Sequence, residues 1–163
     1  MFIAIIFVMI IGIAIWSFMF NPKIYHDESS GIAIEYSSGW IETELTPGDN
    51  ILSSEDGSAF ITITKADKNG KSLSEFFNEY LALFNELDGF EIIESQKTIV
   101  AGMNSEERVF IFDDDSDVTK IKLVVAESNQ GVLYLVGFVT SGEDYDREIE
   151  NFNKMIESVR VEG

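Results

Sequence analysis

The chain has 163 residues, 29 acidic and 11 basic side chains, a formal net charge of −18, and no cysteine. The absence of cysteine excludes disulfide bonds, thiolate metal sites and cysteine nucleophiles. The negative charge, with few and scattered basic residues, disfavours nucleic acid and anionic lipid headgroups as partners and favours solubility, cations and basic proteins.

An apolar segment opens the chain, over residues 1–20. It contains no charged side chain, and Ser17 is its only polar one. A helix of about 20 apolar residues spans the ~30 Å hydrocarbon core of a bilayer. We therefore expect a transmembrane anchor that ends at Asn21-Pro22, because a proline disfavours helix at the residue before it.

Two other interpretations of this segment stay open. A cleaved signal peptide has a basic start and a shorter apolar stretch, whereas the first basic residue here is Lys23. A buried core helix is rarely apolar on all its faces. We favour a single-pass anchor in the cell membrane with the remaining chain on the extracytoplasmic side, although the positive-inside rule has only Lys23 to count.

Behind the anchor we expect a polar linker over residues 21–30 and one folded domain over residues 31–163. The linker contains His26, the only histidine of the chain. Because a zinc or similar site needs further histidine or cysteine ligands, we interpret His26 as a solvated side chain.

Strand patterns begin with the domain. Residues 31–45 alternate between apolar and polar side chains and predict a first pair of strands, with Trp40 in the core. Asp56-Gly57 predicts a hairpin between strands at 51–55 and 58–65.

Two amphipathic helices are predicted. The first begins at the capping box Ser72-Leu73-Ser74-Glu75 and runs to about Leu87, with one broad apolar stripe. The second covers residues 143–159, and the acidic residues at its start suit the helix dipole. We interpret both stripes as core that packs on a sheet.

Residues 119–140 form the centre of the predicted sheet. An alternating run and a nearly all-apolar run at 132–139 flank a polar linker with Gly131, which predicts a hairpin whose second strand is covered on both faces. Further strands are expected at 90–101 and 106–113. Together these elements predict an α+β fold: a largely antiparallel sheet of about six to eight strands packed by the two helices, an α/β/α sandwich, behind the transmembrane helix.

The domain resembles the PsbP-like family of the Mog1/PsbP α/β/α-sandwich superfamily. The matching stretches are Ile32–Trp40, Ser72–Phe77, Thr98–Gly102 and the ending from Val132 through Tyr145-Asp146 to Ile156. The family often has Pro-x-Gly-Trp where this chain has Ser37-Ser38-Gly39-Trp40. The resemblance implies the fold and, because most members are accessory, assembly or docking proteins, a function without catalysis. No residue matches a catalytic site of the family.

The chain contains no nucleophile elbow, phosphate-binding loop or dinucleotide fingerprint. We expect a membrane-anchored, non-catalytic interaction domain that docks a protein partner, for which the charge favours a basic surface, and no cofactor. The alternative is an anchored hydrolase or transferase that uses surface carboxylates. Converging carboxylates in a pocket would favour the enzyme, and a filled core with a flat acidic face would favour the docking domain.

One stretch resembles a cation-binding loop. Asp113, Asp115 and Asp117 match the D-x-D-x-D opening of a calcium loop, but Val118 replaces its glycine and Val124 replaces its bidentate glutamate. An EF-hand is therefore excluded, and Ca²⁺ binding is expected to be weak, about millimolar. The other interpretation is a solvated hairpin tip whose charges discourage edge pairing.

Overall fold

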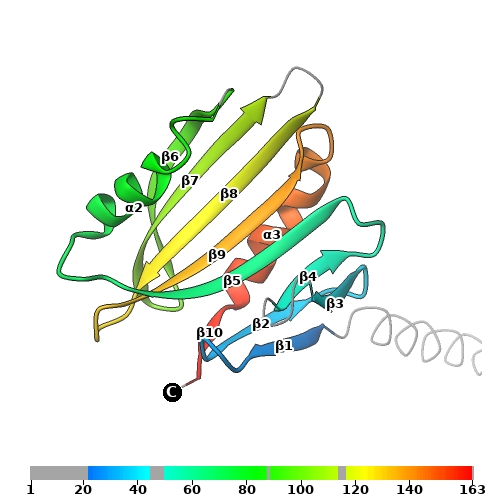
Figure 1. The fold of residues 1–163 in the computed structure, drawn as a ribbon. Coiled ribbons are helices and arrows are strands. Elements are labelled where there is room, and N and C mark those ends of the chain that lie inside the picture. Colours follow the sequence, from blue (N-terminus) through cyan, green and yellow to red (C-terminus); the bar gives the residue numbers. More distant parts are fainter. Residues whose placement is uncertain (1–21, 45–49, 88, 114–116, 163) are drawn as a thin grey trace, which may run out of the picture.

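The computed structural model describes residues 22–44, 50–87, 89–113 and 117–162. Within these ranges it contains two helices and ten strands, which form two antiparallel sheets (Figure 1). The expected anchor at residues 1–20 lies outside the described residues. Neither described helix has the length and the hydropathy needed to cross a bilayer.

The larger sheet has seven strands in the order β3-β4-β5-β9-β8-β7-β6. Its members are β3 (Trp40–Glu44), β4 (Asn50–Ser54), β5 (Ala59–Asp67), β6 (Glu91–Val100), β7 (Met103–Asp113), β8 (Val118–Glu127) and β9 (Val132–Ser141). The hairpins β4–β5 and β8–β9 confirm the predicted turns. Strand β9 lies at the centre, because β5 pairs with one of its edges and β8 with the other.

The second sheet has the order β1-β2-β10, with β1 (Lys23–Asp27), β2 (Ile32–Tyr36) and β10 (Arg160–Val161). The expected linker at 21–30 therefore contains a strand. The Asp27 carboxylate accepts hydrogen bonds from Ser29 and Ser30 and closes the β1–β2 turn. Tyr25, two residues before Asp27, is buried. Because β2 and β3 belong to different sheets, residues 31–45 do not form the expected strand pair.

Helix α2 (Leu73–Ala82) begins with the predicted capping box, in which Ser72 and Glu75 bond each other's backbone N–H groups. It ends at Ala82, earlier than the predicted Leu87, and residues 83–87 continue as turns. Most of their N–H groups bond the carbonyl three residues earlier, as in Phe84 N to Leu81 O at 3.0 Å. Helix α3 (Tyr145–Ser158) lies within the predicted range.

The two helices cover opposite faces of the larger sheet (Figure 1). On one face Phe77 and Leu81 of α2 pack against Leu135 and its neighbours. On the other face α3 and the smaller sheet enclose a second core with Trp40 and Phe138. Because β9 is buried on both faces, the predicted α/β/α sandwich is confirmed.

Candidate functional site

Strand β6 forms one outer edge of the larger sheet. It pairs with β7, and no other strand in the described part of the chain pairs with its outer side. Eight of its ten side chains are exposed and only Val100 is buried. Such an edge presents a row of backbone N–H and C=O groups that can pair with another strand.

The two sides of β6 differ in chemistry. Residues that pair across an antiparallel ladder point to the same face, and Ile92 pairs with Phe110, which packs under α2. Glu94 instead pairs with Val109, which belongs to the core under α3. The register shifts between these two positions, so Ile93 is the extra residue of a β-bulge. Ile92, Ser95, Lys97 and Ile99 therefore lie on the α2 side, and Glu91, Glu94, Gln96 and Thr98 lie on the α3 side.

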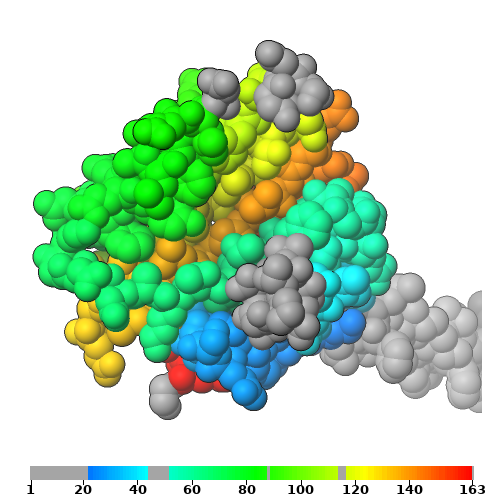
Figure 2. All heavy atoms as spheres, viewed as in Figure 1, coloured from blue at the N-terminus to red at the C-terminus, as the bar shows by residue number. Residues whose placement is uncertain are grey.

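Exposed apolar side chains gather next to this edge. Of the eight large apolar side chains exposed among the described residues, five lie between positions 83 and 99: Leu83, Leu87, Ile92, Ile93 and Ile99. Behind them, the rings of Phe84, Phe90, Phe110 and Phe112 contact one another. Figure 2 shows α2 and the turn after it as a continuous green surface at the upper left, far from the blue strands β1 and β2.

A hollow of about 490 Å³ lies between the start of α2 and the last residues of β6. Its lining includes Leu73, Ser74, Lys97, Ile99, Asn104 and Glu106. Ile99 is 64% exposed at this position. The hollow therefore continues the α2 side of the β6 edge and gives it a depression that can receive a side chain.

A buried ion pair borders the hollow. Arg108 donates to Glu106 Oε1 from Nη2 at 2.7 Å and from Nε at 3.2 Å, and Ser74 donates to Glu106 Oε2 at 2.7 Å. Arg108 Nη1 also donates to Asn78 at 2.8 Å, and the guanidinium lies 4.7 Å from the Phe77 ring centroid. Both charged side chains are less than a tenth exposed.

The hydrogen bonds fix the charge of this carboxylate. Burial raises the pKa of Glu106, but the Ser74 hydroxyl and the Arg108 guanidinium lower it by more, so the net pKa lies below the ordinary value. The hollow's other carboxylate, Glu127, forms an ion pair with Lys68. Both carboxylates of the hollow are therefore ion-paired within the protein.

The acidic loop lies at the other end of β7. Asp113 is the last residue of β7 and Asp117 directly precedes β8, while Asp115 lies outside the described residues. Asp113 and Asp117 line a second hollow of about 590 Å³ together with Lys120 and Glu143. Among the residues that the structure describes, no three His, Cys, Asp or Glu side chains are grouped so that they could hold a metal ion.

The backbone of Asp113 lies very close to the backbone of Gly89. Its N–H donates to the carbonyl of Gly89 at 3.2 Å. Gly89 has a φ of +72°, and a Cβ there would lie 1.9 Å from the Asp113 carbonyl oxygen. Only glycine fits at position 89. The hydrogen bond between Gly89 and Asp113 connects the turn before β6 to the end of β7.

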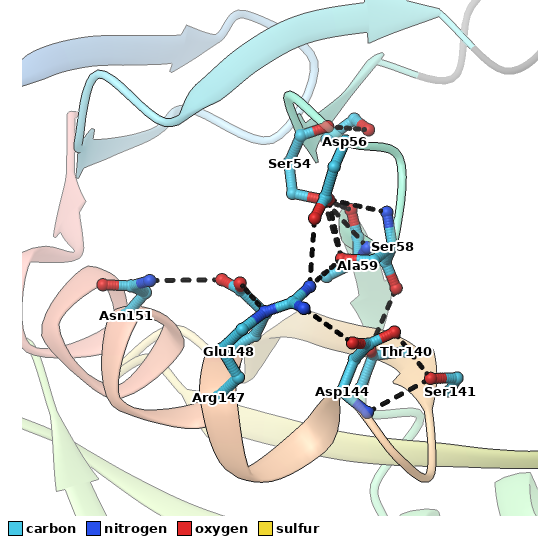
Figure 3. A network of polar contacts seen from close by, with 11 residues as sticks. Ser54, Asp56, Ser58, Ala59, Thr140, Ser141, Asp144, Arg147, Glu148 and Asn151 are labelled. Carbon is cyan, nitrogen blue, oxygen red and sulfur yellow. Dashed lines mark hydrogen bonds and ion pairs between the residues drawn. The ribbon is translucent and has the colours of Figure 1, made fainter.

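A polar network at the start of α3 holds the β4–β5 turn against the helix (Figure 3). Arg147 forms ion pairs with Asp56 at 3.0 Å and Asp144 at 2.8 Å, and it donates to Ser58 Oγ at 2.7 Å. Hydrogen bonds from Ser58 and Ser54, with the charge of Arg147, lower the pKa of Asp56 to about 2. Because these groups bind one another across two elements, we interpret the network as structural.

Sequence reasoning missed the buried charges and the open edge. Lys122, in the run that the alternating pattern predicted, is buried under α3, where it contacts Glu107 at 2.8 Å and Asn153 at 2.9 Å. The run Glu106-Glu107-Arg108 inside a strand was the available signal, since three successive charges cannot all face solvent in a covered strand. The mixed polar and apolar side chains of β6 were the corresponding signal for an edge.

No protein-family model and no curated protein sequence matches the chain. Solved structures do match. Cyanobacterial PsbP (CyanoP) from Synechocystis sp. PCC 6803 has a TM-score of 0.61 at 15% identity, over 86% of this chain and 92% of that one. The Ran-binding protein Mog1p of Saccharomyces cerevisiae has a TM-score of 0.62 at 14% identity, over 86% and 95%.

A third similar structure is LpqN of Mycobacterium tuberculosis, which is involved in cell envelope biogenesis. Its TM-score is 0.60 at 11% identity, over 88% of this chain and 91% of that one. At these identities the similarity establishes the fold. The chain has the Mog1/PsbP-like fold.

Proposed function

We propose that the chain is a membrane-anchored, non-catalytic docking domain that binds a protein partner on the extracytoplasmic side. The observation that carries this proposal is the open edge of β6, ten residues long, with exposed isoleucines and an apolar surface beside it. An extended segment of a partner can add to such an edge through main-chain hydrogen bonds.

The predicted anchor supports this placement of the docking edge. Only two residues separate the apolar segment 1–20 from Lys23, where β1 begins, and two residues span at most about 7 Å. The membrane is then close to the small sheet, which a hydrogen bond of 2.8 Å from Tyr36 to Glu42 joins to β3. Strand β6 lies six strand spacings from β3, about 29 Å, at the opposite edge of the larger sheet (Figure 1).

The similar structures support binding over catalysis. The Saccharomyces protein is named for binding the protein Ran, so a chain of this fold can act by holding another protein. The enzyme alternative requires available carboxylates in a pocket, whereas Glu106 and Glu127 in the hollow beside α2 are both ion-paired. Asp113, Asp117 and Glu143 line the second hollow, so an enzyme that uses carboxylates would have to act there.

Site-specific photo-crosslinking in the native membrane tests the proposal. A photoreactive residue is placed at Ser95 on β6 and, as a matched control, at Ile41 on the opposite edge strand β3, which is also exposed. We expect a discrete protein adduct from position 95 and none from position 41. The same adducts from both positions, or none from position 95, would contradict docking at this edge.

Location is tested separately on the same cells. We expect protease added to intact cells to digest the domain and alkaline carbonate to leave the full-length chain in the membrane. Resistance of the domain to protease would show that the orientation is wrong, and release by carbonate would show that the anchor is wrong.

A further inference from the structure

We propose that the partner presents an extended segment in which apolar residues alternate with lysine or arginine, and that this segment adds to β6 as an eighth strand. The inference rests on the proposed docking function and names the chemistry of the partner. It follows from the two different sides of the β6 edge, because successive side chains of an added strand point to opposite faces of the sheet.

The α2 side of the edge selects apolar side chains. Along the regular stretch an added strand would place every second side chain beside Ser95, Lys97 or Ile99, and Ile99 borders the hollow whose wall includes Leu73. Lys97 also lies on this side, where it pairs in register with Glu106. Burying Ile99, which is largely exposed, against an apolar partner side chain removes apolar surface from water and favours binding.

The α3 side of the same edge selects positive charge. Glu94, at the start of the regularly paired stretch, and Glu91, beyond the bulge, are both exposed there. Burial raises the pKa of the Tyr145 hydroxyl, and the charge of Glu94 adds to this rise, so Glu94 acts on this side of the sheet. Opposite charges that face each other across neighbouring strands stabilise the pair, and like charges destabilise it.

The bulge limits the length of the segment. Regular pairing of β6 with β7 runs from Glu94 to Val100, and the register shifts before it at Ile93. An added strand therefore pairs in one register along about seven residues, which span about 23 Å. The net charge of −18 disfavours a second copy of this chain as the occupant, because two such edges would bring like charges together.

Three fluorescent peptides of eight residues test the alternation. The first alternates lysine and valine, the second has the same composition with the lysines in one block, and the third alternates glutamate and valine. Their binding to the full-length chain in a nonionic detergent is measured by fluorescence anisotropy at physiological salt, where long-range charge effects are screened. We expect the first peptide to bind at least about tenfold more tightly than the second, and the third not to bind.

Matched variants locate the contact. We expect Glu94→Lys to weaken the alternating peptide about tenfold and Ile99→Asp to weaken it at least as much. Glu150→Lys on the exposed surface of α3 makes the same change in net charge and should leave binding unchanged. Both β6 side chains are exposed, so these variants are expected to fold, which circular dichroism checks.

The following results would contradict the inference. Equal binding of the alternating and block peptides, or equal loss in Glu94→Lys and Glu150→Lys, would show attraction to net charge alone. A dimer in light scattering that Ile99→Asp dissociates would show that a second copy occupies the edge. If the peptides fail while position 95 still crosslinks one protein, the docking function stands and the partner chemistry is wrong; if that crosslink also fails, the function is wrong as well.

Discussion

Replacing Arg108 with methionine tests the buried ion pair beside the β6 edge. Arg108 is 8% exposed and Glu106 is 5% exposed, and the guanidinium supplies two of the three side-chain hydrogen bonds to that carboxylate. In the variant the carboxylate keeps only Ser74 as its donor. Breaking a buried pair in this way costs about 3–5 kcal/mol, a large part of a typical total stability of about 5–15 kcal/mol.

The pH dependence distinguishes this cause from lost packing. In the unmodified chain Glu106 has a lowered pKa, so its contribution to stability is complete above 4.5, the ordinary value for glutamate, and is lost as the pH falls through the folded-state pKa. In the variant, burial without the guanidinium raises the pKa instead. The loss of unfolding free energy in Arg108→Met is therefore largest near neutral pH. It becomes smaller as acid protonates the carboxylate, so the stabilities of the two chains converge toward acid pH.

Urea unfolding followed by far-UV circular dichroism measures both effects on a chain that starts at Pro22. Arg108→Lys keeps the positive charge and loses the paired donors. Its free energy of unfolding should therefore lie between those of the unmodified chain and Arg108→Met. The double variant Glu106→Met, Arg108→Met should recover part of the loss, because no buried charge remains unpaired. A loss below about 1 kcal/mol at neutral pH, or a loss that does not change with pH, would refute the reasoning.

Three further predictions follow from particular residues. Ala101→Asn should stabilise the chain by about 0.5–1 kcal/mol in the same assay, because Ala101 has a φ of +51° before Gly102, a conformation that Asn69 adopts before Gly70; no gain would contradict strain at this turn. Leu135→Asp should abolish cooperative unfolding, since Leu135 is buried in the central strand, and a cooperatively melting variant would show otherwise. Millimolar Ca²⁺ should raise the Tm, and this rise should vanish when the loop aspartates become asparagine; an equal response to Mg²⁺, or persistence in the variant, would contradict a site at Asp113, Asp114, Asp115 and Asp117.

The sequence by itself determined the elements whose signals are local. The reciprocal bonds of Ser72 and Glu75 begin α2, and Asp56-Gly57 supplies the tight turn of β4–β5. The all-apolar run at 132–139 predicted a strand covered on both faces, and β9 is that strand. Each of these signals involves residues a few positions apart, so one stretch of chain is enough to read it.

Only the tertiary structure decided which strand is an edge and which charges are buried. The mixed polar and apolar side chains of Glu91–Val100 suit an edge strand, but the fact that β6 has a single neighbour depends on the order of all seven strands. Lys23–Asp27 became a strand by pairing with β2, and Lys122 became buried because α3 covers its side of the sheet. The open β6 edge and the ion pairs beside it depend on long-range pairing and on helix placement, which local periodicity does not encode.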